Sequence, residues 1–442
     1  MWDKPSIMIE RTVERADAAL RFHVNKTDRF KMSRLSFNFI FPADAERSPR
    51  IKLMLATVMR GCEKYPTVVD INKRLDELYG ATVTWRASSV GEKHVFRISS
   101  EILSNKYRFE GDDESIVGSV CEVITDILFA PLRSCDGLLS KENFESERRL
   151  AIDALKAKIN DQKAYAADNC KTLMFKGHSA GIPIDGTVEL LEKITLEEIS
   201  ESLGYFLQNS VIECYYTGSD DVDEVISSVS EKFASIGRGE IASLEKERVF
   251  LPEDSAKIKQ LDETMRVSQS RLNIGCIGGA VMSDSEYYAM SLFNEIFGGS
   301  SVAKLFMNVR EKHSLCYYCY SSYGSATGTL MISCGIKREN REKAMAEIEK
   351  QLSEMQKGHF DDSDIETAKR TIISGLSQIY DSPAAIEAFK FRRFLAGICE
   401  TPEQAAEGIG AVSKDDIVSA ANKIRISAIY FLEGTGEEDD YE

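Results

Sequence analysis

The chain has 442 residues, of which 43% are hydrophobic and 29% are charged, and its formal net charge is −16 at pH 7. A chain of this length exceeds one ordinary hydrophobic core, so we expect two or more domains. The composition is typical of a globular protein, and the acidic balance argues against a nucleic-acid partner, because no basic cluster stands out to neutralise phosphates.

Targeting signals and cysteine usage favour a cytoplasmic protein. No apolar run approaches the roughly 20 residues that span a membrane, and residues 1–15 lack the apolar core of a signal peptide. The ten cysteines are scattered, unlike a disulfide framework. Cys316 and Cys319 form the one close pair. Three positions apart on a strand, they should face opposite sides, which argues against a redox pair or a zinc site.

The first half mixes strand-like and helical segments. Thr67 is a candidate cap and Gly80 a candidate stop for an amphipathic helix between them. In chain order we predict strands within 19–41, helices at 51–59 and 67–79, strands at 81–87 and 94–100, helices at 114–129 and 142–175, a loop at 181–187, a helix from 196, a strand at 211–216 and a helix at 222–233.

Residues 236–258 combine glycine, charges and a proline, so we interpret them as a linker between domains at 1–235 and 259–442. The second half repeats the order strand, helix, helix, hairpin, long helices, strand. Its predicted elements are strands at 265–276, 315–323, 330–336 and 426–432 and helices at 285–297, 301–311, 341–357, 362–380, 384–395 and 414–423. Hairpin-joined strands with long helices predict an α+β fold with largely antiparallel sheets.

The segment 294–323 is the most informative stretch. Gly298 and Gly299 free the backbone for a turn, and Ser300 or Ser301 is a candidate cap of the helix that follows. Helical spacing places four apolar residues of that helix on one face: Val302, Leu305, Phe306 and Val309.

Arg310 and Tyr317 follow in the same segment. Arg310 lies in the last turn of the predicted helix and Tyr317 at the start of the next strand. This order resembles the second half of insulinase/pitrilysin-type peptidases, which carry a Gly-Gly-x-x-x-x-x-Leu-Phe helix, then Arg-Glu-Lys, a Gly-Leu pair and a Tyr. Ser314 stands where the family has that Gly, and residues 181–187 resemble its Gly-x-Pro-Ile-x-Gly loop. The resemblance implies two homologous α/β-roll halves in a clamshell arrangement, and it implies that Arg310 and Tyr317 hold an extended substrate peptide.

The zinc site of the family is not matched. Catalytic relatives carry His-x-x-Glu-His on a helix of the first half, where two His bind zinc and the Glu activates water. Alignment through Gly61 puts Lys52 and Ala56 at the two ligand positions and Leu55 at the position of the base. The third ligand of the family, a Glu seven residues after a Glu-Arg pair, corresponds to Ala154.

These replacements imply a non-catalytic member that binds no cofactor itself. In relatives of this size, such as mitochondrial processing peptidase and bacterial two-gene relatives, one chain carries zinc and its partner carries the Arg/Tyr pair. We therefore expect the substrate-binding subunit of a heterodimeric zinc peptidase. It would not be an enzyme alone, but would act on peptides with a zinc-bearing relative.

Two alternatives stay open. The chain is a scaffold that keeps the fold for assembly only, like the core subunits of respiratory complexes, or it is a carrier that binds a peptide without cutting it. Arg310 and Tyr317 also have a structural interpretation, in which the arginine caps its helix and the tyrosine packs in the sheet.

Overall fold

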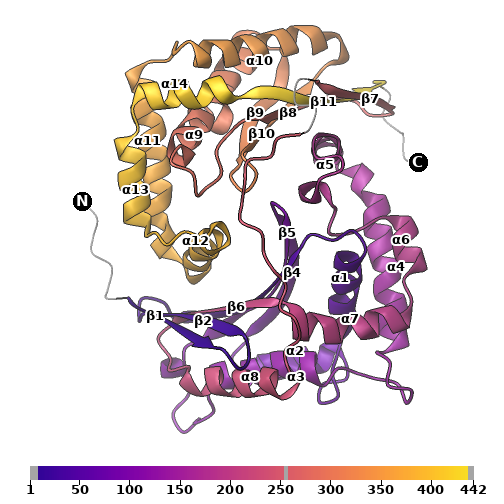
Figure 1. The fold of residues 1–442 in the computed structure, drawn as a ribbon. Coiled ribbons are helices and arrows are strands. Elements are labelled where there is room, and N and C mark those ends of the chain that lie inside the picture. The colour runs from indigo at the N-terminus through magenta and orange to yellow at the C-terminus, as the bar shows by residue number, and fades with distance from the viewer. Residues whose placement is uncertain (1–7, 253–256, 437–442) are drawn as a thin grey trace. The chain divides into compact units, whose positions relative to one another are not determined.

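The computed structural model describes residues 8–252 and 257–436. They form two compact units (Figure 1), and neither unit is a continuous stretch of chain. The first unit comprises Met1–Lys156, Ile182–Glu245 and Tyr380–Lys390, and the second comprises Ala157–Gly181, Lys246–Ile379 and Phe391–Glu442. Each sequence half thus gives one segment to the unit built mainly from the other half.

The first unit contains a six-stranded sheet in the order β1-β2-β6-β3-β5-β4. Neighbouring strands are antiparallel except for β2 and β6, which are parallel. The strands are β1 (Ile9–Arg15), β2 (Leu20–Lys26), β3 (Met32–Pro42), β4 (Thr82–Val90), β5 (Lys93–Leu103) and β6 (Val211–Gly218).

The second unit contains a five-stranded sheet in the order β7-β11-β8-β10-β9. Only β7 and β11 are parallel. The strands are β7 (Lys259–Met265), β8 (Ser270–Ile277), β9 (Cys316–Gly324), β10 (Thr329–Ile336) and β11 (Arg425–Gly434).

The two sheets repeat one topology. Strands β2-β6-β3-β5-β4 of the first sheet correspond in order to β7-β11-β8-β10-β9 of the second, including the single parallel pair and the hairpin at the edge. The predicted α+β fold of two similar halves with largely antiparallel sheets is confirmed. In this repeat, β4 and β9 are equivalent edge strands.

Helices complete each unit. In the first unit they are α1 (Arg47–Val58), α2 (Val68–Glu77), α3 (Ile116–Phe129), α4 (Lys141–Ala157), α6 (Val188–Lys193), α7 (Leu196–Asn209) and α8 (Asp223–Ser235). In the second they are α5 (Gln162–Met174), α9 (Tyr287–Asn294), α10 (Arg341–Gln356), α11 (Asp362–Ser377), α13 (Pro402–Ala411) and α14 (Lys414–Lys423), while α12 (Pro383–Ala396) contributes its first half to the first unit and its second half to the second. Within the described residues, no helix combines the length and the apolar character needed to cross a membrane.

Strand periodicity explains how helices cover the second sheet on both faces. Phe431 of β11 enters the core formed with α9, α10 and α14. The residues on either side of it, Tyr430 and Leu432, enter a separate core with α5. Successive side chains of a strand point to opposite faces, so β11 packs against helices on both sides (Figure 1). The segment that contains α5 is therefore an integral part of the second unit.

In the first unit the sheet has one apolar and one polar face. Apolar residues of β3 such as Phe37 and Phe39 enter the main core. On the other face, the fully buried carboxylate of Glu387 from α12 accepts hydrogen bonds from Arg34 Nε at 2.6 Å and Ser36 Oγ at 2.7 Å. A buried carboxylate needs such partners to offset its lost hydration.

Side-chain caps explain several helix boundaries and one wrong prediction. Thr67 accepts from the Asp70 amide in a capping box, and Gly80 follows with a φ of 71°, as predicted for this helix. The single long helix predicted at 142–175 is wrong. The chain breaks it at Asp161, whose side chain accepts from the Ala164 amide and caps α5.

The linker predicted at 236–258 contains anchored residues at its second end. Phe250 is buried, donates its amide to Thr327 O at 2.7 Å and packs against the Phe175 ring with the centroids 4.5 Å apart. The carboxylate of Glu247 is buried and pairs with Arg392. These residues belong to the second unit, and residues 253–256 lie outside the described part of the chain.

Candidate functional site

Residues that suit packing occupy the α1 positions that the resemblance predicts for a metal site. Lys52, Leu55 and Ala56 lie on α1. Leu55 is fully buried in the core, where a carboxylate would be strongly desolvated. Lys52 is half-buried and carries a positive charge, which would repel a metal ion. The described residues include no group of three or more His, Cys, Asp or Glu able to hold a metal.

An ion pair ties this position to the loop at 181–187. The Lys52 ammonium group pairs with the carboxylate of Asp185. Next to it, Gly186 has a φ of 71°, and a Cβ there would lie 2.8 Å from the Pro49 side chain. Only glycine meets both requirements at low cost. The loop that resembles the family's Gly-x-Pro-Ile-x-Gly motif thus packs directly on α1 beside Lys52.

The third position that the resemblance predicts for a metal ligand lies on α4. Ala154 is exposed there and offers no ligand atom. Seven residues earlier, Glu147 pairs with Arg60 at 3.4 Å, and burial raises the pKa of Glu147. Glu147 therefore acts as an anchor between α4 and the end of α1.

The segment 294–323 folds differently from the predicted helix–turn–helix. Helix α9 ends in a π-helical turn at Glu295–Gly299, and the next helix begins only at Lys304 and continues as the π-helix Phe306–Lys312. Neither Ser300 nor Ser301 lies at its N-cap, so the predicted cap is wrong. The predicted apolar face holds for Leu305 and Val309, which are buried, but not for Val302, which precedes the helix and is exposed.

Arg310 lies in the last turn of this π-helix. Its side chain is 43% exposed, and its guanidinium lies 4.7 Å from the Phe306 ring centroid and 3.6 Å from the Glu311 carboxylate. Stacking on an aromatic face directs a guanidinium without using up its hydrogen-bond donors. Arg310 therefore keeps donors for a further acceptor.

A tight turn joins this helix to β9. Ser314 has a φ of 49°, and its amide donates to Arg310 O at 2.9 Å, while the Leu315 amide donates to Val309 O. A left-handed residue after a helix is usually glycine. Ser314 therefore adopts a backbone conformation that suits the glycine of the sequence pattern it resembles.

Tyr317 lies in a β-bulge of edge strand β9. Tyr318 pairs with Gly335 and Cys316 pairs with Ile336, which leaves Tyr317 as the extra residue. Its side chain is 57% exposed. Bulges re-aim side chains and are frequent beside functional sites. The structural interpretation, in which Tyr317 packs in the sheet, does not fit this exposure.

The bulge also overturns the predicted geometry of the cysteine pair. Cys319 lies opposite Cys334, and Cys316 lies opposite Ile336, two residues further along β10. Cys334 and Ile336 lie two positions apart on β10, so their side chains point to the same face of the sheet. Residues directly opposite them on β9 share that face. Cys316 and Cys319 therefore point to the same side. Sequence reasoning missed this group, although a glycine inside a predicted strand, Gly335, is the usual signal of a bulge.

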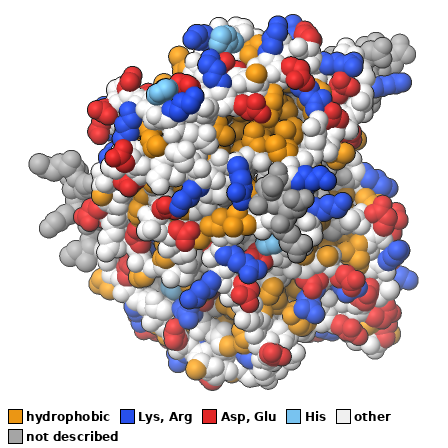
Figure 2. Space-filling model, turned by 45° about the horizontal axis from the view of Figure 1, so that its top comes forward, with side chains coloured by type: hydrophobic (Ala, Val, Ile, Leu, Met, Phe, Trp, Pro, Cys, Tyr) orange, Lys and Arg blue, Asp and Glu red, His pale blue; other side chains and the backbone are white. Residues whose placement is uncertain are grey.

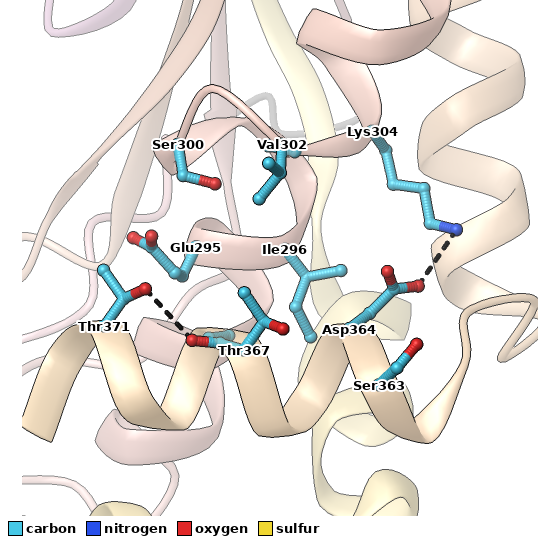
Figure 3. Close-up of a pocket in the computed structure, with 11 residues that line it drawn as sticks. Glu295, Ile296, Ser300, Val302, Lys304, Ser363, Asp364, Thr367 and Thr371 are labelled. Atoms are coloured by element: carbon cyan, nitrogen blue, oxygen red, sulfur yellow. Dashed lines mark hydrogen bonds and ion pairs between the residues drawn. The ribbon is translucent and has the colours of Figure 1, made fainter.

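A small pocket of about 190 Å³ lies elsewhere in the second unit, between the π-helical turn and α11. Lys304 reaches across it to Asp364 at 3.3 Å (Figure 3), and burial raises the pKa of Glu295 in its wall. Ligand pockets usually hold roughly 300–1,000 Å³. We therefore interpret this pocket as a polar crevice between two helices.

Surface charge shows no preference for an anionic polymer on the face drawn in Figure 2. Acidic and basic side chains of the described residues are interspersed there. A nucleic-acid site needs a continuous basic surface, and the described residues on this face do not form one.

Comparisons with known proteins agree with this structure. A family model described as "Peptidase M16 inactive domain" matches residues 193–372. The chain is 28% identical over 416 residues to the "Probable inactive metalloprotease YmfF" of Bacillus subtilis (strain 168), which covers 94% of this chain and 96% of that protein. A more distant relative is the "Cytochrome b-c1 complex subunit 1, mitochondrial" of Saccharomyces cerevisiae, at 21% identity, with 68% of this chain and 67% of that protein covered.

A solved structure agrees over the full length. The crystal structure of a conserved protein from Enterococcus faecalis V583 has a TM-score of 0.86 and 26% identity, with 97% of this chain and 100% of that chain covered. The repeated sheets, the matched family model and these relatives lead to one conclusion. The chain is similar in fold and sequence to M16 (insulinase/pitrilysin-type) peptidases, including a relative named as probably inactive, and it lacks the His-x-x-Glu-His motif.

Proposed function

We propose that the chain is the non-catalytic, substrate-binding subunit of a heterodimeric zinc peptidase that processes peptides. One asymmetry carries the proposal. The four metal-site positions hold Lys52, Leu55, Ala56 and Ala154, none of which ligates zinc, whereas Arg310 and Tyr317 are present and exposed.

The edge of the second sheet supplies the binding mode. Strand β9 pairs with β10 on one side only, so its other side presents backbone groups to an added strand. An extended peptide would pair there by β-augmentation. Arg310 would donate a charge-assisted hydrogen bond to a peptide carbonyl, and the Tyr317 hydroxyl would donate a second bond.

The partner would supply the chemistry. Zinc would be bound by a relative that carries His-x-x-Glu-His, and this chain would bind no cofactor. The charge of Lys52 beside Asp185 supports this division of roles, because a cation fills the former ligand position. We propose that both chains act in the cytoplasm.

Copurification tests the partnership. The tagged full chain would be captured from its native cells, and the coeluting proteins identified by mass spectrometry. We expect a chain of similar size that bears His-x-x-Glu-His, in a stoichiometric amount, and chelator-sensitive cleavage of peptides by the eluate. Recovery of this chain without such a relative would contradict the proposal.

A scaffold role is the second candidate, since the chain is similar to a subunit named for the cytochrome b-c1 complex. A scaffold would copurify in a stable assembly but bind no peptide at β9. A carrier would bind peptides with no turnover and no effect of chelator. Peptide binding and chelator sensitivity, measured on one eluate, therefore separate these roles.

A further inference from the structure

We propose that Cys316, Cys319 and Cys334 form a peroxide-reactive thiol site, in which Cys316 is oxidised first and then forms a disulfide with Cys319. The site lies at the edge hairpin β9–β10 next to Tyr317, and its reaction does not require peptide processing. Cys319 and Cys334 are buried, and Cys316 is partly exposed, so one sulfur of the group is open to a small oxidant.

The strand register brings the three residues together. Cys319 and Cys334 lie directly opposite each other, and the bulge at Tyr317 places Cys316 on the same face. Cys316 and Cys319 lie opposite Ile336 and Cys334, which are two residues apart on β10. Two residues extend roughly 6.8 Å along a strand, so the Cα atoms of Cys316 and Cys319 are about that far apart. Disulfides join Cα atoms about 4.4–6.8 Å apart. The diagonal from Cys316 to Cys334 is longer, about 7–8 Å, so Cys319 is the nearer partner.

The surroundings favour the thiolate of Cys316. Hydrogen bonds from the thiols of Cys319 and Cys334, and then the positive charge of Arg310, lower the pKa of Cys316. The hydrogen bond with Cys316 and then burial raise the pKa of Cys319, and they outweigh a hydrogen bond with Cys334 that lowers it. The thiolate is the reactive form of cysteine. The group therefore contains one nucleophilic sulfur beside a protonated one.

The chemistry balances with hydrogen peroxide as the oxidant. The Cys316 thiolate attacks one peroxide oxygen, the O–O bond breaks, and the released hydroxide takes a proton to form water. The Cys319 sulfur then attacks the sulfenic acid, the S–O bond breaks, and a second water leaves. Two thiols lose two electrons and two protons in total, and one peroxide becomes two waters. The disulfide closes a short loop around Tyr317.

Competition among the cysteines of the wild-type chain tests the site without any substitution. The reduced full chain would be treated with limiting N-ethylmaleimide, or with hydrogen peroxide followed by alkylation, and mapped by mass spectrometry without reduction. Cys135 and Cys399 serve as references because both are exposed. We expect Cys316 to be alkylated at least tenfold faster than either, and a Cys316–Cys319 disulfide to form first under peroxide.

Single variants assign the roles. In Cys316→Ser, the disulfide at Cys319 should form at least tenfold more slowly, and Cys135→Ser should leave the wild-type rate unchanged. The proposal is overturned if Cys135 or Cys399 reacts first while the hairpin thiols stay reduced. It is also overturned if Cys316→Ser forms a Cys319–Cys334 disulfide at the wild-type rate.

Discussion

At the scale of single residues, the replaced positions show how the chain departs from its relatives. Lys52 is stabilised by Asp185, and Leu55 is part of the core. These replacements could be predicted from the sequence, because the motif has fixed spacing. Their partners could not, since the contact of Lys52 with Asp185 joins residues 133 positions apart.

Ser314 provides a residue-scale prediction. Its φ of 49° is unfavourable for a residue with a Cβ. Ser314→Gly should stabilise the chain by about 0.5–1 kcal/mol. The substitution removes the backbone strain of the folded state, and this gain exceeds the extra conformational entropy that glycine loses on folding. Denaturant unfolding would measure the change.

The matched control lies on the next strand. Ser322 is exposed on β9 and is not among the residues with positive φ. Ser322→Gly should destabilise the chain slightly. Equal effects of the two substitutions would show that the turn at Ser314 is not strained.

At the scale of elements, the hairpin β9–β10 was predicted correctly in its bounds but not in its register. Both strands are predicted within a residue or two of their observed ends, because aromatic and β-branched residues mark them. The bulge was not predicted, since register depends on the pairing of two strands. Helix α13, capped by Thr401, was not predicted. Its sequence does contain two signals of a helix start, a capping box and Pro402.

Gly335 tests the structure of this edge. A Cβ at Gly335 would lie 2.4 Å from the Tyr318 ring, so the ring must move. Gly335→Ala should destabilise the hairpin by about 1–3 kcal/mol, as overpacking usually does. Amide hydrogen exchange in β9 should speed up.

Gly375 is the control for this substitution. It lies in α11, and a Cβ there would meet nothing within 4 Å. Gly375→Ala should stabilise the chain by about 0.5–1 kcal/mol. Unchanged exchange in β9 of Gly335→Ala would contradict the observed packing of Tyr318.

At the scale of the whole molecule, the two units depend on exchanged segments. The repeat of two similar sheets was predicted from the order of elements. The exchange was not, because residues 157–181 and 380–390 belong to the unit that is distant in sequence. Such assignments rest on non-local packing, which periodicity does not reveal.

Glu387 tests the importance of the exchanged segment. Its buried carboxylate lies 2.6 Å from Arg34 Nε and 3.3 Å from Arg97 Nε. Glu387→Ala should destabilise the first unit by about 3–5 kcal/mol, because the partly buried Arg34 and Arg97 lose the buried carboxylate that they share. Thermal unfolding would measure the loss.

The exposed Glu366 on α11 provides the comparison. Glu366→Ala should change stability by less than about 0.5 kcal/mol. If Glu387→Ala changed stability as little as Glu366→Ala, the first unit would not need the segment 380–390.

Peptide turnover by the assembled pair is the measurement that tests the proposed function most directly. The chain, as wild type, Arg310→Ala or Lys312→Ala, would be combined with its zinc-bearing relative, and kcat/KM measured at equal complex formation. Lys312 is an exposed cation on the same helix and controls for lost charge. Loss of a charge-assisted hydrogen bond predicts a fall of about 10–100-fold for Arg310→Ala and little change for Lys312→Ala. Equal turnover by all three pairs would contradict the substrate-binding role.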